Sequence, residues 1–206
     1  MRTDYINPEL YKVIFMYMTY DNALALEVSL HTGMRIGDVL KIRPDDLQDD
    51  GIHYVAEKTG KQGVAPISRR LAEKLIKNGN KWWCFPHRDS PRLKHRTRQA
   101  VWKDVKRAAQ IVRGNGLIDD QNVAPHSGRK TFAVVDKAQH GADHAQTALQ
   151  HSSRSTTEIY TESDKLVGVP PSYKDNTEVL RRLNTLDKKI DNVLFLLQSC
   201  CRSGSA

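Results

Sequence analysis

The chain has 206 residues, of which 39% are hydrophobic and 27% are charged, a composition typical of a globular protein with one core. No apolar run is long enough to span a membrane, and the N-terminus lacks the apolar core of a signal peptide, so we expect a cytoplasmic protein. Three cysteines, Cys84, Cys200 and Cys201, cannot form a disulfide framework, and their spacing differs from that of zinc-site pairs. We interpret them as free thiols.

The positive charge is concentrated in one segment, residues 81–113. It holds ten Lys or Arg against two Asp, a surplus of eight that equals the net charge of the whole chain, +8. Such a segment is often only a solvated surface, but a phosphate backbone would bind it with salt-dependent affinity. We favour an anionic partner, with double-stranded DNA as the candidate.

The first helices are predicted from their end signals. Asn7-Pro8 predicts a helix over residues 8–18, and Asp21 is expected to cap the next apolar segment, which ends at Gly33. Residues 52–56 and 64–67 have strand composition and are expected to pair as a hairpin.

The middle of the chain predicts two more helices. Ser68 should cap a helix over residues 69–78, and Thr97 one that runs to about residue 112. The apolar positions expected to face inward are Leu71, Leu75, Ile76, Val101, Val105, Ala108, Ala109 and Val112. The aromatic run at residues 82–86 is expected to pack in the core.

The last third predicts a helix from Pro125 to Gly141, a short helix, and then a change of pattern. We place one domain over residues 1–167. Residues 168–206 are expected to form a linker, a C-terminal helix over about residues 176–197 and a frayed tail. The apolar residues of this last segment alternate in steps of four and three, the seam of a coiled coil that is too short to be stable alone. We expect it to pack on this domain or on a neighbouring copy.

Two stretches carry residues suited to phosphate chemistry. His126 and Arg129 are three residues apart and project from one face of a helix, where both can meet the same anion. Tyr160 follows His151 by nine residues, and a tyrosine among phosphate-binding groups suggests a nucleophile. Each stretch alone is a weak signal, because His-x-x-Arg occurs on many solvated helices.

Together these stretches resemble the tyrosine recombinase (phage integrase) family. Residues 150–160, Gln-His-Ser-Ser-Arg-Ser-Thr-Thr-Glu-Ile-Tyr, are similar to its Gly-His-Ser-x-x-x-Thr-Thr-x-x-Tyr run, and residues 32–40, Thr-Gly-Met-Arg-Ile-Gly-Asp-Val-Leu, to its Thr-Gly-x-Arg-x-x-Glu-Leu box. The resemblance spans roughly residues 7–164. It implies an α+β fold, mostly α-helical, with a small antiparallel β-sheet or hairpin in a helical catalytic domain.

The resemblance also implies an activity: site-specific DNA cleavage and rejoining through a covalent 3′-phosphotyrosyl intermediate, without metal, ATP or another cofactor. Tyr160 would be the nucleophile, Arg35 and Arg129 would clamp the phosphate, and His151 would hydrogen-bond it. His126 would assist proton transfer. Lys58, at the hairpin tip and preferred over Lys61, would protonate the leaving oxygen, and we expect Asp38 to orient Arg35. Two departures are a glutamine and a lysine, at positions 150 and 130, where the family usually has glycine and histidine.

Partners follow from the same resemblance. We expect a nucleoid-associated homo-oligomer, tetrameric when two sites are paired on DNA, with exchange of the C-terminal helix between protomers as one arrangement. A set of basic residues is expected to contact DNA: Lys61, Arg96, Arg98, Lys103, Lys106 and Arg107. Many family members carry a further helical domain before the catalytic one, so the chain is either a catalytic fragment or a small single-domain recombinase.

Three alternatives remain open. A type IB topoisomerase or a hairpin-telomere resolvase uses similar residues but does not join two sites in the same way. A non-cleaving DNA-binding regulator would keep the fold without the chemistry. A third interpretation takes His126, His140, His144 and His151 as metal ligands, although no carboxylate or cysteine in sequence completes a familiar spacing.

Overall fold

A computed structural model describes residues 3–150, which all belong to the first of two compact units, Met1–Leu166. His151, Tyr160, the predicted linker and the predicted C-terminal helix lie outside the described residues. The elements are, in order, α1 (Pro8–Met16), α2 (Tyr20–Thr32), α3 (Ile36–Val39), η1 (Pro44–Asp46), β1 (Leu47–Gln48), β2 (Gly51–Val55), β3 (Gln62–Ala65), α4 (Arg69–Asn78), α5 (Arg98–Gly114), α6 (Pro125–His140) and α7 (Ala142–Ala148). None of the helices in this described part is long and apolar enough to cross a bilayer.

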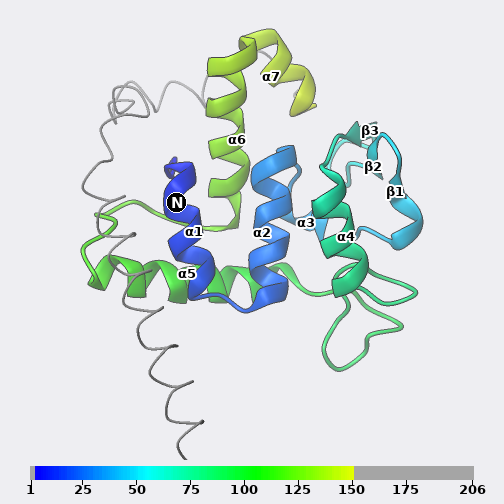
Figure 1. Cartoon of the computed structure of the whole chain (residues 1–206), viewed down its shortest axis with the longest axis horizontal. Helices are drawn as coiled ribbons and strands as arrows, with labels where there is room; N and C mark the ends of the chain where they lie inside the picture. Colours follow the sequence, from blue (N-terminus) through cyan, green and yellow to red (C-terminus); the bar gives the residue numbers. More distant parts are fainter. Residues whose placement is uncertain (1–2, 151–206) are drawn as a thin grey trace, which may run out of the picture. The chain divides into compact units, whose positions relative to one another are not determined.

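The helix α2 is the centre of the helical core. It contacts α3, α4, α5 and α6, and Figure 1 shows it between α6 and α4, with α5 running across the lower ends of α1 and α2. Most of its apolar side chains are buried, and the helices around it supply the rest of the core. The fully buried side chains include Ile14, Leu24, Leu26, Val28, Leu75, Val101, Val105 and Val112.

The helix ends follow the local signals in the sequence. The side chains of Asn7, Ser68 and Thr97 accept hydrogen bonds from backbone N–H groups in the first turns of α1, α4 and α5. Gly141 ends α6 as predicted. These capping bonds replace the intrahelical partners that the first N–H groups of any helix lack.

Gly33 ends α2 with a backbone angle that favours glycine. Its φ is +68°, in the left-handed region, and a Cβ at this position would stand 2.5 Å from Cδ1 of Phe132 on α6. A side chain would therefore strain the backbone and also separate α2 from α6. The requirement explains the glycine two residues before Arg35.

A three-stranded antiparallel sheet has the order β1-β2-β3. The predicted hairpin is confirmed, with Ile52 opposite Ala65 and Val55 opposite Gln62. The strand β1 was not predicted, because its two residues are too few for an alternating pattern. The outcome is the mostly helical α+β architecture with a small sheet that the sequence indicated.

Several local predictions are wrong. The helix α1 ends at Met16, two residues earlier than expected, and Thr19 rather than Asp21 is the N-cap of α2. Ile76 is 60% exposed because α4 buries a narrow stripe that contains Leu71 and Leu75. Trp82 is 48% exposed, since the Asn80 side chain binds the backbone of a turn there. Cys84 and Phe85 are buried as predicted.

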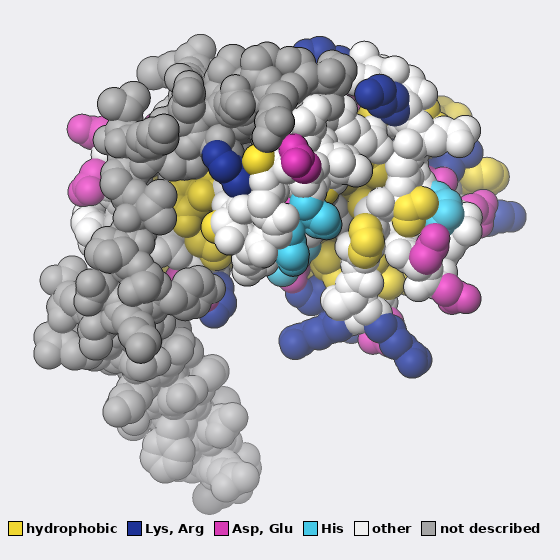
Figure 2. Space-filling model, turned by 90° about the horizontal axis from the view of Figure 1, so that it is seen from above, with side chains coloured by type: hydrophobic (Ala, Val, Ile, Leu, Met, Phe, Trp, Pro, Cys, Tyr) yellow, Lys and Arg dark blue, Asp and Glu magenta, His cyan; other side chains and the backbone are white. Residues whose placement is uncertain are grey.

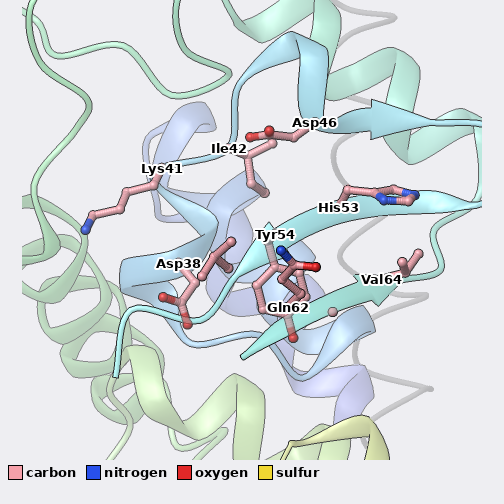
Figure 3. A pocket seen from close by; sticks show the side chains of 10 residues that line it. Asp38, Lys41, Ile42, Asp46, His53, Tyr54, Gln62 and Val64 are labelled. Carbon is pink, nitrogen blue, oxygen red and sulfur yellow. The ribbon is translucent and has the colours of Figure 1, made fainter. Parts of the chain in front are cut away.

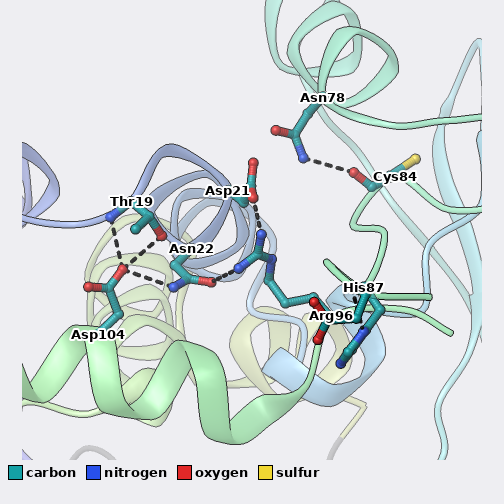
Figure 4. A network of polar contacts seen from close by, with 9 residues as sticks. Thr19, Asp21, Asn22, Asn78, Cys84, His87, Arg96 and Asp104 are labelled. Atoms are coloured by element: carbon teal, nitrogen blue, oxygen red, sulfur yellow. Dashed lines mark hydrogen bonds and ion pairs between the residues drawn. The ribbon is translucent and has the colours of Figure 1, made fainter. Parts of the chain in front are cut away.

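A polar network joins α2, α5 and the loop before α5 (Figure 4). The carboxylate of Asp104 accepts hydrogen bonds from the backbone N–H and hydroxyl of Thr19 and from Asn22 at 2.8 Å. It also accepts one from Arg107 at 2.6 Å. Arg96 donates to Asn22 and pairs with Asp21. Burial raises the pKa of Asp104, but the hydrogen bonds outweigh that effect and hold this pKa below its ordinary value.

Asp104→Ala should destabilise the protein by about 2–4 kcal/mol, because its removal leaves several donors without an acceptor in a partly buried place. Urea denaturation would measure the loss. Because the pKa of Asp104 is lower in the folded protein than in the unfolded one, its carboxylate stabilises the fold at pH values above the unfolded pKa. The difference in unfolding free energy between the parent and Asp104→Ala should therefore shrink as the pH falls through the folded pKa.

The control for Asp104 is Glu73→Ala, which breaks a 3.1 Å pair with Arg69 on the surface of α4. Exposed pairs of this kind contribute about 0–0.5 kcal/mol. If both variants lose equally little, the network has no special role in stability.

Candidate functional site

The first predicted arginine stands where α2 turns into α3. Arg35 is the N-cap residue of α3 and follows the buried Met34. Its side chain is partly exposed, and among residues 3–150 it has no hydrogen bond or ion pair. The Ser29 hydroxyl donates to the Met34 carbonyl at 2.8 Å, which fixes the backbone beside it. The backbone that carries Arg35 is therefore fixed, while the N–H donors of its guanidinium remain available for a ligand.

Asp38 does not orient Arg35, contrary to the expectation from their spacing. One carboxylate oxygen of this buried residue accepts a hydrogen bond from the backbone N–H of Glu57 at 3.0 Å. The other oxygen has no hydrogen-bond partner in the described part of the chain. Glu57 also pairs with Lys41 of the α3 region at 2.9 Å. Asp38 therefore ties α3 to the turn that carries Lys58.

Lys58 and Lys61 both lie in the turn between β2 and β3, and both are exposed. The turn is closed by hydrogen bonds from Ala56 N–H to the Lys61 carbonyl at 2.9 Å and from Gly60 N–H to the Ala56 carbonyl at 2.8 Å. These bonds fix the backbone and leave the lysine side chains extended from it. The two lysines differ in one respect: the charge of Lys58, and not that of Lys61, contributes to the lowered pKa of His126.

The second predicted arginine is buried and hydrogen-bonds to two separate segments of the chain. Arg129 on α6 is 2% exposed, and its guanidinium donates from Nη1 to the Gly33 carbonyl at 2.5 Å and from Nη2 to the Leu149 carbonyl at 2.7 Å. It thus joins the end of α2, two residues before Arg35, to the residue after α7. A Cβ at Gly128 would stand 3.0 Å from Cδ1 of Leu26, so the small residue beside Arg129 allows α6 to approach α2 closely.

His126 lies in the first turn of α6, in a field of positive charge. The pKa of its imidazole is lowered to about 4, first by desolvation and then by the charges of Arg129, Arg35, Lys130 and Lys58, in that order. Lys61 is not among these charges. The structure therefore places four of the predicted catalytic residues, His126, Arg129, Arg35 and Lys58, in one electrostatic environment. The catalytic role of each, and the choice of Lys58 over Lys61, stay predictions.

The depressed pKa predicts a stability effect. Between about pH 6.5 and pH 4 the unfolded imidazole binds a proton that the folded one does not, so His126 destabilises the fold as pH falls through that window. The loss between pH 7 and pH 5 should be about 2 kcal/mol.

The measurement compares urea denaturation of the parent and of His126→Gln at both pH values. The unfolding free energy of His126→Gln should not show the decrease between pH 7 and pH 5 that is assigned to His126. The other titrating groups are the same in both proteins, so their contributions cancel in the comparison. Equal pH dependence in the two proteins would mean that the imidazole is solvated and not held in a positive field.

Tyr54 on β2 is a neighbour of the cluster that the sequence did not suggest. Burial raises the pKa of its phenol, Arg129 and Arg35 oppose the rise, and Asp38 adds to it. A cavity of about 590 Å³ opens beside it, and Figure 3 shows Tyr54 with Gln62 of β3 at its centre. A tyrosine in an ordinary strand pattern carries no sequence signal for such a place.

Gln150, where the family usually has glycine, adopts a conformation that favours glycine. Its φ is +53°, a left-handed value that is uncommon for other residues. Its side-chain amide donates to the Gln62 carbonyl at 3.4 Å, a long bond that lays the end of α7 against β3. The residue immediately before His151 is therefore placed against the hairpin that carries Lys58.

The six residues predicted to contact DNA differ in their availability. Lys61, Arg98 and Lys103 are exposed and have no hydrogen bond or ion pair from their side chains within residues 3–150. By contrast, Arg96 pairs with Asp21, Lys106 donates to Asn122 at 2.5 Å, and Arg107 binds Asp104 and the Tyr17 carbonyl. Half of the set is thus already engaged inside the protein.

Comparison with known proteins extends the likeness beyond these motifs. The model of the phage integrase family matches residues 7–166. The tyrosine recombinase XerD of Yersinia pestis is 32% identical over 150 residues, which is 66% of this chain and 48% of that protein. The chain thus spans about half the length of this curated relative.

Solved structures share the fold. A lambda integrase dimer bound to a COC′ core site aligns with a TM-score of 0.65 at 22% identity, over 78% of this chain and 48% of that one. A lambda integrase tetramer bound to a Holliday junction aligns with a TM-score of 0.59 at 20% identity, over 78% and 48%. With a family model that covers most of its length and a fold shared with these integrases, the chain belongs to the phage integrase family.

Proposed function

We propose that this chain is the strand-cleaving and rejoining part of a site-specific tyrosine recombinase that acts on double-stranded DNA. The observation that carries the proposal is the positive cluster around His126, formed by Arg35, Arg129 and Lys58. Like charges gathered in a partly desolvated place repel one another unless an anion lies among them. A phosphodiester is the anion that this arrangement and the family both favour.

In the proposed reaction, the Tyr160 phenol attacks the scissile phosphorus and loses its proton. A bond forms between phosphorus and the phenolic oxygen, and the bond from phosphorus to the 5′-oxygen breaks, which leaves a 3′-phosphotyrosyl link and a free 5′-hydroxyl. The covalent link conserves the energy of the phosphodiester, so the hydroxyl of another strand can reverse the attack without ATP. His151 is assigned a hydrogen bond to the phosphate.

The cluster residues stabilise and move charge in this scheme. Arg35 and Arg129 donate to the non-bridging oxygens as negative charge builds on them. Lys58 gives its proton to the departing 5′-oxygen. The low pKa of His126 keeps the imidazole neutral at pH 7 in the free protein, so it can accept the phenolic proton. A bound phosphate would raise that pKa again and retain the proton.

The proposal includes DNA contacts and assembly. Lys61, Arg98 and Lys103 are proposed to bind backbone phosphates, because they are exposed and uncommitted among the described residues. Arg96, Lys106 and Arg107 would have to exchange their internal partners for phosphate. Because lambda integrase is described as a tetramer on a Holliday junction, we propose that this chain also assembles on paired sites.

The test is covalent trapping. A duplex carrying the recognition sequence is nicked one or a few nucleotides beyond the cleavage point, so that the short released strand diffuses away and rejoining fails. We expect a protein–DNA adduct that survives denaturation, joined to a 3′-phosphate and mapped by mass spectrometry to the peptide containing Tyr160. Binding without any adduct would favour the non-cleaving regulator. Relaxation of supercoiled DNA without exchange between two sites would favour the topoisomerase.

A further inference from the structure

A carboxylate and two imidazoles meet at the corner between α6 and α7. Asp136 is 6% exposed, and its two oxygens stand 2.9 Å from Nδ1 of His140 and 2.8 Å from Nδ1 of His144. The ring centroids of the two histidines are 4.7 Å apart, and their side chains are 53% and 57% exposed. We call these three residues the corner cluster; histidine side chains gather on the face seen in Figure 2.

The separations suit a metal ion. One ligand atom from each residue lies within 4.8 Å of the other two. Around a zinc-class ion with bonds of about 2.0–2.2 Å, neighbouring ligand atoms stand roughly 3 to 3.5 Å apart, so small side-chain movements would complete the site. Two imidazoles and a carboxylate also form a donor set that such ions bind in proteins.

The chain path makes the cluster possible. His140 is the last residue of α6, and Gly141, with φ at +91°, turns the chain into α7, where His144 lies in the first turns. Beside the cluster is a cavity of about 350 Å³ that Asp136 and His144 line together with His31. That space can hold the water molecules that complete the coordination of an ion with three protein ligands.

Sequence reasoning grouped His140 and His144 with His126 and His151 and found no carboxylate to complete the set. The structure supplies that carboxylate, Asp136, and it leaves His126 out of the cluster. Asp136 was missed although it is only one helical turn before His140 and two before His144. Its carboxylate meets both histidines only because the chain turns between α6 and α7 and places His144 beside it.

We propose that Asp136, His140 and His144 bind a divalent transition metal ion of the zinc class, with water in the remaining positions. Each neutral imidazole would bind the metal through Nδ1 and carry its proton on Nε2, so that the ion takes the place now occupied by the hydrogen-bonding protons. No oxidation is involved. Protonation of the histidines competes with binding, so affinity should weaken at acidic pH.

The metal would link α6 to α7. The helix α7 leads directly to Leu149, whose carbonyl accepts the Nη2 hydrogen bond of Arg129. An ion at the corner would therefore hold the end of α7 in the position that this bond requires. The proposal concerns residues outside the positive cluster, and metal binding can be present or absent whether or not the chain cleaves DNA.

The experiment uses the full chain without a polyhistidine tag, stripped of metal. The background is Cys200→Ser/Cys201→Ser, because a free thiol can act as a zinc ligand whatever its spacing. Cobalt(II) serves as a spectroscopic probe and zinc as its competitor. We expect a visible absorption band that saturates at one equivalent of cobalt and disappears when zinc is added. Zinc at a hundredfold excess over its dissociation constant should raise the Tm by about 5 °C or more.

The variants decide which residues bind. His140→Gln and His144→Gln remove exposed side chains and should each weaken cobalt binding at least tenfold without loss of folding. His53→Gln is the matched control, because His53 makes a similar 2.6 Å contact with Asp50 but has no second histidine beside it among residues 3–150. Absence of a cobalt band and of a Tm shift would overturn the proposal. So would unchanged binding in both corner variants, or an equal loss in His53→Gln.

Discussion

Arg129→Lys should lower the rate of DNA cleavage by about a hundredfold to a thousandfold, the usual cost of losing one charged donor to a developing oxyanion. The guanidinium has a second role, because it donates to the carbonyls of Gly33 and Leu149. A lysine ammonium at the same place cannot reach both carbonyls in the same planar geometry and also face a phosphate. The variant should therefore lose both catalysis and stability, the latter by about 1–3 kcal/mol.

Single-turnover cleavage of the nicked duplex at saturating protein measures the first loss, and urea denaturation measures the second. Thr131→Val is the control that separates the loss of cleavage rate from the loss of stability. Thr131 is fully buried on α6, two residues after Arg129, and its hydroxyl exchanges hydrogen bonds with the backbone of Ile6 and not with the positive cluster. This control should lose comparable stability and cleave at nearly the parental rate.

Arg35→Lys completes the comparison. Because Arg35 has no hydrogen bond or ion pair in the described structure, the substitution should leave stability within about 0.5 kcal/mol of the parent while cleavage still falls. Near-parental cleavage in both arginine variants would contradict the phosphate clamp. Slow cleavage in Thr131→Val as well would show that the assay reports stability.

The helices could be predicted from sequence because their signals are local. Capping side chains at Asn7, Ser68 and Thr97 and the glycines at 33 and 141 act within a few residues, and the structure uses each of them. The inward face of α5 was also predicted, since all of its expected apolar residues are buried. The strand β1 escaped because its pairing depends on β2 and not on its own two residues.

The catalytic roles of the site residues stay predictions, and the contacts that hold these residues in place could not be predicted from the sequence. Four catalytic candidates were chosen from family-like boxes, and the structure brings them together. The partners of Asp38 and Arg129 were not predictable, because each binds a backbone group about twenty or more residues away. Nothing in a sequence pattern shows which carbonyl a buried guanidinium will meet. The same long-range dependence hid Tyr54, whereas the carboxylate of the corner cluster is close in sequence to its histidines and was missed because the direction of the turn at Gly141 could not be foreseen.

The largest expected effect is the loss of the covalent adduct when the nucleophile is removed, and two tyrosines, Tyr160 and Tyr54, are compared for that role. Tyr160→Phe should abolish the covalent adduct, because phenylalanine has no oxygen to attack phosphorus. Binding should remain near the parental affinity, since the basic residues are unchanged. Tyr54→Phe is the matched control: its phenol lies near Arg129 and Arg35, yet burial raises its pKa and makes the phenolate harder to form.

The paired variants assign the nucleophile. Trapping on the nicked duplex, with binding measured in parallel at the same salt concentration, should give an adduct with Tyr54→Phe and none with Tyr160→Phe. The opposite pattern would move the nucleophile to β2 and require the phosphate to enter the cavity beside Tyr54. An adduct in both variants would exclude both phenols, and the attacking residue would then have to be found by sequencing the DNA-linked peptide. The first pattern is expected because Tyr160 stands at the tyrosine of the family's run, whereas burial raises the pKa of the Tyr54 phenol and opposes its loss of a proton.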